Sequence, residues 1–154
     1  MTQAPRAGGT LALDHGDKRT GLAYADALGI TATPLATFHG AGDSSALLDH
    51  VAGVLAERDV ARLLVGLPLN ADGSENPRCA VARAFARRLQ ARFPALELEL
   101  VDEHLTSKAA EQLLREAGYA PRESRARRDS WSALVLLHDW LHSTQGRAPD
   151  AGPG

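Results

Sequence analysis

The chain has 154 residues, of which 44% are hydrophobic, so it is long enough for one domain around a single buried core. Its net charge of -2 does not mark the whole chain as a nucleic-acid-binding protein, because such proteins usually carry a basic surface overall. A single cysteine, Cys79, excludes an internal disulfide and disfavours a cysteine-based zinc site, and no stretch is typical of a signal peptide or a membrane span, so we expect a cytoplasmic protein.

Three short apolar segments near the start predict three antiparallel strands joined by hairpins. They cover Thr10–Asp14, Gly21–Ala25 and Gly29–Phe38. Because proline has no N–H to donate to a ladder, Pro34 predicts an edge or a bulge in the third strand. The first strand ends at Asp14, and a carboxylate is unexpected at the end of a segment that should be buried in the core.

The middle of the chain alternates helix and strand patterns. Asp43 or Ser44 can cap a helix, and its apolar positions recur at helical spacing at Leu47, Leu48, Val51, Val54 and Leu55. The segment "ARLLVGLP" predicts a buried strand that Pro68 ends, and a loop follows.

A second helix is predicted from Pro77, which suits a first helical turn. Its apolar repeat comprises Val81, Phe85 and Leu89, whereas the basic residues that fall elsewhere are Arg83, Arg87 and Arg88. The segment "LELELVDE" alternates apolar and acidic residues, as a strand near a sheet edge does.

The last third of the chain predicts two more helices, one from a Thr106 cap to Ala117 and one over Asp129–His142, with Leu134, Leu137, Trp140 and Leu141 on its apolar side. The order of elements predicts an α/β fold with a mixed five-stranded sheet, three antiparallel strands followed by parallel ones, flanked by helices. We expect one domain over residues 1–143 and a disordered tail over 144–154.

Four acidic residues stand at predicted element ends: Asp14, Asp102, Glu103 and Asp129. Each alone is most often a turn former or a helix cap. Carboxylates that come together in a poorly solvated site repel one another unless a cation intervenes. Because the candidate ligands are oxygens, they suit Mg²⁺ or Mn²⁺, and such ions promote phosphodiester hydrolysis.

An arginine-rich segment precedes the last helix and contains Arg122, Arg125, Arg127 and Arg128 beside Asp129. Arginine side chains match phosphate oxygens, so a nucleic-acid backbone is a candidate ligand, and a solvated loop is the alternative. The segment "GDKRTGLA" lacks the Lys and Ser/Thr of a Walker loop, and no Gly-x-Ser-x-Gly motif is present.

Four ordered motifs between Leu11 and Leu141 resemble the YqgF/RuvX family of pre-rRNA nucleases and Holliday junction resolvase-like proteins. They are "LALDHGDKRTGLAYAD", "VGLPLNADGSENPR", "VDEHLTSKAAEQLL" and "RRDSWSALVLLHDWL". The resemblance implies an RNase H-like fold and a catalytic trio that binds Mg²⁺ or Mn²⁺, made of Asp14, Glu103 and Asp129. Asp102 is then expected on the other face of its strand.

The resemblance also guides our choice of residues that contact the nucleic-acid backbone: Lys18, Arg19, Asn70, Arg78, His104, Arg127 and Arg128. His104 stands where the family usually has arginine, so a phosphate contact there would weaken above the ordinary pKa of histidine.

We expect a metal-dependent nuclease that acts in 5′ processing of pre-16S rRNA, as a monomer or homodimer, with nucleic acid and a pre-ribosomal particle as partners and no membrane. Cleavage of Holliday junctions or other branched DNA is an alternative, because the same acids serve both. A non-catalytic binding factor in ribosome maturation or transcription is another. A relative of the sugar-kinase and actin ATPases is disfavoured, because those proteins need two such domains.

Overall fold

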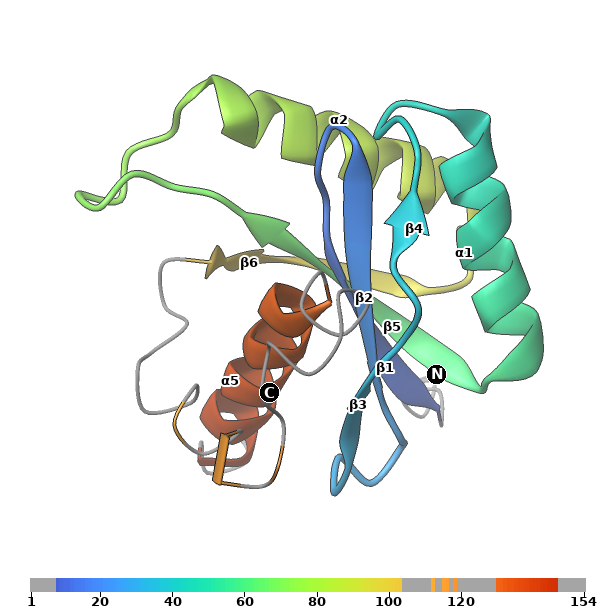
Figure 1. Ribbon diagram of the computed structural model, residues 1–154, viewed down its shortest axis with the longest axis vertical. Coiled ribbons are helices and arrows are strands. Elements are labelled where there is room, and N and C mark those ends of the chain that lie inside the picture. Colours follow the sequence, from blue (N-terminus) through green and yellow to red (C-terminus); the bar gives the residue numbers. More distant parts are fainter. Residues whose placement is uncertain (1–7, 104–111, 113–114, 117, 119–129, 147–154) are drawn as a thin grey trace, which may run out of the picture.

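The computed structural model describes residues 8–103, 112, 115, 116, 118 and 130–146. A mixed sheet with the strand order β3-β2-β1-β5-β6 forms its centre, and β4 pairs with β2 beside this path (Figure 1). The strands are β1 (Gly9–Asp14), β2 (Arg19–Ala25), β3 (Ala32–Pro34), β4 (Phe38–His39), β5 (Val60–Leu67) and β6 (Glu97–Asp102). The β1/β2, β2/β3 and β2/β4 pairs are antiparallel, and the β1/β5 and β5/β6 pairs are parallel, which confirms the predicted order.

Three helices cover the sheet in the described part of the chain: α1 (Ser45–Glu57), α2 (Pro77–Arg92) and α5 (Trp131–Gly146). The first two lie on one face and α5 lies on the other (Figure 1). β1, β5 and β6 run parallel to one another, so their C-terminal ends lie at the same edge of the sheet, between the two helical layers. The functional residues that the sequence predicts at strand ends therefore meet at one edge of the sandwich.

The third predicted strand is two short strands, β3 and β4, separated by Leu35–Thr37. Pro34 ends β3, which is the edge strand, as proline requires. The chain stays close to β2, because the Leu35 amide donates to the Leu22 carbonyl at 2.9 Å. Pairing then resumes where Phe38 and His39 align with Thr20 and Arg19.

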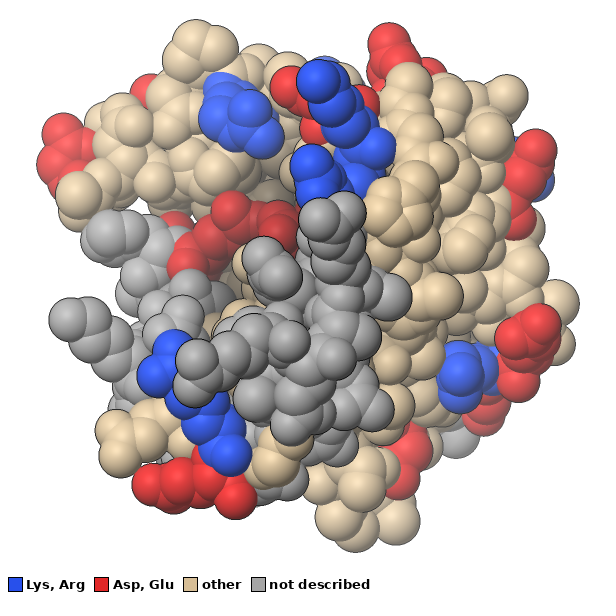
Figure 2. All heavy atoms as spheres, viewed as in Figure 1, with Lys and Arg blue, Asp and Glu red and all other residues tan. Residues whose placement is uncertain are grey.

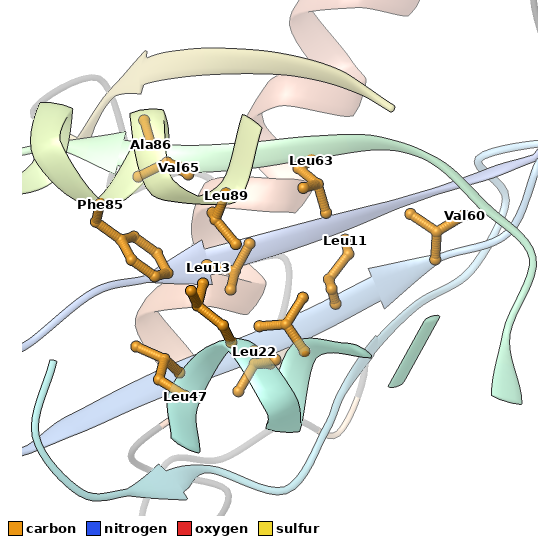
Figure 3. Close-up of a cluster of buried hydrophobic side chains, with 12 residues drawn as sticks. Leu11, Leu13, Leu22, Leu47, Val60, Leu63, Val65, Phe85, Ala86 and Leu89 are labelled. Carbon is orange, nitrogen blue, oxygen red and sulfur yellow. The ribbon is translucent and has the colours of Figure 1, made fainter. Parts of the chain in front are cut away.

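The larger core fills the space between the sheet, α1 and α2. Strand residues of one face, among them Leu11, Leu13, Leu63 and Val65, point toward these helices (Figure 3). Each such leucine is fully buried and contributes roughly 1.5–3 kcal/mol through the hydrophobic effect. α1 begins as predicted, because Ser44 Oγ accepts a hydrogen bond from the Leu47 amide.

The opposite face of the sheet carries small side chains where α5 packs. Ala12, Ala23 and Ala25 are buried there against Leu134 and Leu137 of the helix. Alanine on the strands leaves room for a close approach of α5, and larger residues on the helix fill that room. The predicted apolar side of this helix is confirmed, and the helix runs to Gly146, beyond the predicted end at His142.

α2 begins at Pro77 as predicted, and the Asn76 side chain caps it by accepting hydrogen bonds from the Arg78 and Cys79 amides. Its predicted apolar repeat is wrong at one position, because Val81 is 48% exposed. Phe85 and Leu89 are buried, and the remaining buried positions of α2 are Cys79, Ala82 and Ala86. The buried face of α2 is therefore formed by these five residues, and Val81 lies outside it.

The predicted helix from Thr106 to Ala117 and the predicted tail fall largely outside the described residues. Within the part of the chain that the structure describes, no helix is both long enough and apolar enough to span a membrane.

Candidate active site

Asp14 and Glu103 come from strands that are not neighbours, but both belong to the α5 face of the sheet. Ala12 and Val101 pack on that face, and side chains two residues further along a strand point the same way. Asp14 is the last residue of β1, and Glu103 directly follows β6. By the same alternation Asp102 falls on the α2 face, as the sequence predicts.

Gly66 of β5 separates the two acidic residues and makes their contact possible. The parallel register aligns Leu13 with Val65 and Gly66 with Val101, so Gly66 lies between the ends of β1 and β6. A Cβ atom added to Gly66 would overlap the Glu103 carboxylate and lie 2.6 Å from its Cγ. The Glu103 side chain therefore folds back over the glycine.

The Glu103 carboxyl forms a hydrogen bond with the Asp14 carboxyl. Burial, this hydrogen bond and the negative charge of Asp14 together raise the pKa of Glu103 to about 8. Asp102 adds to the increase, whereas the positive charge of Arg78 opposes it. At neutral pH the metal-free pair therefore shares a proton, with Glu103 as the donor.

Basic side chains border this acidic pair. Figure 2 shows acidic side chains in a recess of one face of the molecule, with lysine and arginine side chains above them. Arg78, in the first turn of α2, is 63% exposed and lies 3.9 Å from Asp17. Lys18 and Arg19, in and after the β1–β2 turn, are exposed as well. The structure thus brings three of the predicted backbone-contacting residues to the sheet edge that carries Asp14.

Asn70 has a structural role in the loop between β5 and α2. Its Nδ2 donates to Ser74 Oγ and its Oδ1 accepts from Asn76 Nδ2, both within 2.9 Å. Asn76 also donates to the Pro68 carbonyl at 2.8 Å. The amide of Asn70 therefore braces the loop, and a role in nucleic-acid contact stays a prediction.

Four predicted site residues lie outside the described residues: His104, Arg127, Arg128 and Asp129. The chain is described again from Ser130, which is fully buried at the start of α5. Ser130 Oγ accepts a hydrogen bond from the Leu22 amide at 3.2 Å and donates to the Leu35 carbonyl at 2.8 Å. Leu22 is next to Gly21, the residue that pairs with Asp14.

No group of three or more acidic, histidine or cysteine side chains within the described ranges is arranged to hold a metal ion. The described part of the site is a pair, Asp14 and Glu103. Gly66 lies in the predicted strand segment "ARLLVGLP", but no functional role was predicted for it. A signal was present, because a glycine inside a buried strand often marks a close approach of another group.

Comparisons with known proteins agree with this architecture. The sequence model of the RuvX family, described as "Holliday junction resolvase", matches residues 8–143. A protein of Chlorobium phaeobacteroides named "Putative pre-16S rRNA nuclease" is 38% identical over 136 residues, which cover 87% of this chain and 92% of that protein. A protein of the same name from Anaeromyxobacter sp. (strain Fw109-5) is 45% identical over 132 residues, covering 85% and 94%.

Among solved structures, RuvC of T. thermophilus in complex with a Holliday junction substrate superposes with a TM-score of 0.60 at 15% identity, covering 90% of this chain and 96% of that one. The fold is therefore the RNase H-like fold of RuvC. The family model and the curated relatives span most of the chain, and the chain belongs to the RuvX (YqgF) family.

Proposed function

We propose that this protein is a nuclease that hydrolyses phosphodiester bonds with the help of Mg²⁺ or Mn²⁺. The observation that carries the proposal is the pair of carboxyl groups of Asp14 and Glu103, which are in contact and partly buried. Ionisation of both carboxyl groups is unfavourable without a nearby cation, because the two negative charges repel each other, so the pair favours binding of a cation. The available ligands are oxygen atoms, which hard divalent ions prefer.

Asp129 is proposed as the third acidic ligand. It immediately precedes Ser130, whose hydroxyl is bound to β2 one residue away from the partner of Asp14. The anchor at Ser130 ties the N-terminal end of α5 to the end of the sheet that carries the pair. When bound, a divalent ion would neutralise the carboxylates and polarise the phosphodiester for attack by water.

The protein residues have distinct tasks in this proposal. Asp14 is fixed by an inner strand of the sheet and Glu103 by its contact with Gly66, so both carboxylates are preorganised. Arg78 places a positive charge close enough to act on Glu103 and is exposed to a ligand. It is therefore well placed to attract a phosphate group to the acidic pair.

The substrate that we propose is the precursor of 16S rRNA, at its 5′ side. Two relatives, which are 38% and 45% identical to this chain over 136 and 132 aligned residues, carry the name "Putative pre-16S rRNA nuclease". A branched DNA substrate is the second candidate, because the description of the family model names Holliday junctions. Both substrates contain phosphodiester bonds that metal-assisted hydrolysis can cleave, and they differ in their shape and in the 2′-hydroxyl that only RNA carries.

Cleavage assays with matched variants test this proposal. The purified chain would be incubated with Mn²⁺ or with EDTA and two labelled substrates, an RNA spanning the 5′ end of 16S rRNA and a four-way DNA junction. We expect Mn²⁺-dependent cleavage of the RNA by the wild type, and no cleavage by Asp14→Asn or Glu103→Gln. Glu57→Gln, at the exposed end of α1, is the control for loss of a carboxylate and should cleave normally.

Each other result points to a different conclusion. Cleavage confined to the junction would favour the resolvase function. RNA binding without cleavage in any divalent ion would favour a non-catalytic factor. Cleavage by Asp14→Asn that equals the wild type would refute the proposed site.

A further inference from the structure

A groove lies beside the acidic pair, on the side of the sheet that α2 covers. It consists of two adjoining cavities of about 460 Å³ and 230 Å³. Both are lined by His15, Asp17 and Val81, so they form one continuous depression. The larger cavity is within the size range of pockets that bind small ligands.

One wall of the groove is rigid. The His15 ring stacks on Phe85, with the ring centres 4.1 Å apart and the planes inclined by 13°. His15 Nε2 lies 2.7 Å from the Gly42 carbonyl oxygen, which fixes the orientation of the ring. An added Cβ at Gly42 would lie 2.7 Å from His15 Nε2, so the loop at Gly42 packs directly on the ring.

The other wall is a stripe along α2. Arg78, Val81, Ala84 and Arg88 follow one another at spacings of three or four residues, which places them on one side of a helix. Arg78 lines the smaller cavity and Arg88 the larger one. With a rise of 1.5 Å per residue, these two arginines stand about 15 Å apart along the helix. Val81 between them is an exposed large hydrophobic residue.

Arg78 joins the groove to the acidic pair. It lines the smaller cavity, and its charge also acts on Glu103. A strand whose phosphate lies next to Asp14 and Glu103, on a divalent ion that the two carboxylates would hold, can therefore continue past Arg78 into the groove.

We propose that this groove holds the unpaired part of the substrate strand next to the bond that is cut, with a base against His15 and Val81 and phosphates near Arg78 and Arg88. This inference rests on the proposed nuclease function. It adds that the strand beside the cleavage point is single, not part of a duplex.

The lining suits an unpaired nucleotide better than a phosphate group alone. Asp17 and Asp43 also line the groove and would repel a phosphate, but their carboxylates can accept hydrogen bonds from the amino groups of bases. The apolar surface of Val81 and the His15 ring offer contact to the face of a base. In a duplex that face is covered by stacking, so it is unavailable to the groove.

Binding measurements in EDTA test the groove independently of cleavage. The probe is a fluorescently labelled 20-nucleotide RNA, either single-stranded or annealed to its complement, and the readout is anisotropy at several salt concentrations. Arg88→Gln is compared with Arg87→Gln, because both remove one arginine from neighbouring positions of α2 and Arg87 does not line the groove. Val81→Glu is compared with Ala91→Glu, another exposed position of the same helix.

We expect the wild type to bind the single strand more tightly than the duplex. Arg88→Gln should lower the slope of log affinity against log salt by about 0.7, the value for one phosphate contact with a single strand, and Arg87→Gln should not change it. Val81→Glu should weaken binding and Ala91→Glu should not. Circular dichroism and Tm of each variant verify that it is folded.

The inference is wrong if Arg88→Gln and Arg87→Gln behave alike, if the duplex binds as tightly as the single strand, or if neither RNA binds. Its failure is distinguishable from failure of the proposed function. Mn²⁺-dependent cleavage with a groove that does not discriminate would overturn only the groove. Groove-dependent binding without cleavage in any ion would overturn the nuclease and leave the groove as a binding site for single-stranded RNA.

Discussion

Replacing Glu103 with glutamine should change the pH dependence of stability in the metal-free protein. Burial and the hydrogen bond to Asp14 raise the pKa of Glu103 from its ordinary value of 4.5 to about 8 in the folded state. In the unfolded chain the carboxyl ionises near its ordinary value. Between these pH values the folded protein holds more protons than the unfolded chain, so the free energy of unfolding falls as pH rises, and the loss is complete above about 8.

The size of this effect follows from the same interval. At about 1.4 kcal/mol for each pH unit, the increase from 4.5 to about 8 sets an upper limit of about 5 kcal/mol. Solvent reaches the pair, because both residues are only partly buried, so screening lowers the expected value to roughly 1–2 kcal/mol. For a chain of this length, that energy corresponds to roughly 2–8 °C in Tm.

The assay is thermal unfolding in EDTA between about pH 5 and pH 9 for the wild type, Glu103→Gln and the control Glu57→Gln. Glutamine does not ionise, so Glu103→Gln should gain stability relative to the wild type as pH rises. Glu57→Gln should follow the wild type, because Glu57 is exposed at the end of α1. Parallel curves for the wild type and Glu103→Gln across this range would refute the shared proton.

Adding Mn²⁺ should raise the Tm of the wild type more at pH 8.5 than at pH 6.5, because the ion competes with the proton on Glu103. If Mn²⁺ raised the Tm of Asp14→Asn by the same amount, the result would contradict this site. Gly66→Ala should weaken Mn²⁺ binding about 10- to 100-fold in a calorimetric titration, because the new methyl group displaces the Glu103 carboxylate; unchanged affinity would show that their contact is unimportant. Ser130→Ala should lower the free energy of unfolding, measured in urea, by about 1–3 kcal/mol, because it deprives buried polar groups of a hydrogen-bond partner. Ser132→Ala, at an exposed position, should have little effect. Equal losses of stability in the two variants would argue against Ser130 as an anchor of α5.

The strands and helices with strong local signals were predictable from sequence. Ser44 and Asn76 stand at helix starts where their side chains cap the backbone, although only Ser44 was anticipated as a cap. The run "LLVG" follows the expected pattern of a strand buried on both faces. Signals within a few residues, such as helix caps and apolar runs, determine these elements, so packing against the rest of the chain did not alter them.

The errors arose where packing overrode local pattern. Val81 fits an apolar repeat with Phe85 and Leu89, but the helix turns Cys79, Ala82 and Ala86 toward the sheet instead, because small residues allow α2 to approach closely. Pro34 indicated an irregularity in the third strand, but the place where pairing resumes, at Phe38 and His39, depends on β2 and could not be predicted from residues 29–38 alone.

The candidate site was predictable in part. Acidic residues at the ends of strands indicated that Asp14 and Glu103 could meet, and they do. The role of Gly66 requires the register of three strands, because it depends on which residue of β5 lies between the two acids. His15 was missed for a similar reason: its stacking partner Phe85 is distant in the sequence.

The two strands that carry the acidic residues have different numbers of neighbours in the sheet. β1 is held on both sides by β2 and β5, whereas β6 is held by β5 alone in the described part of the chain. Outer strands fray before inner ones, so warming should detach the glutamate from the aspartate while the interior of the sheet is still intact. Amide exchange along β6 would then accelerate first, and the contact between Glu103 and Asp14 would be lost at temperatures below the cooperative melting of the domain.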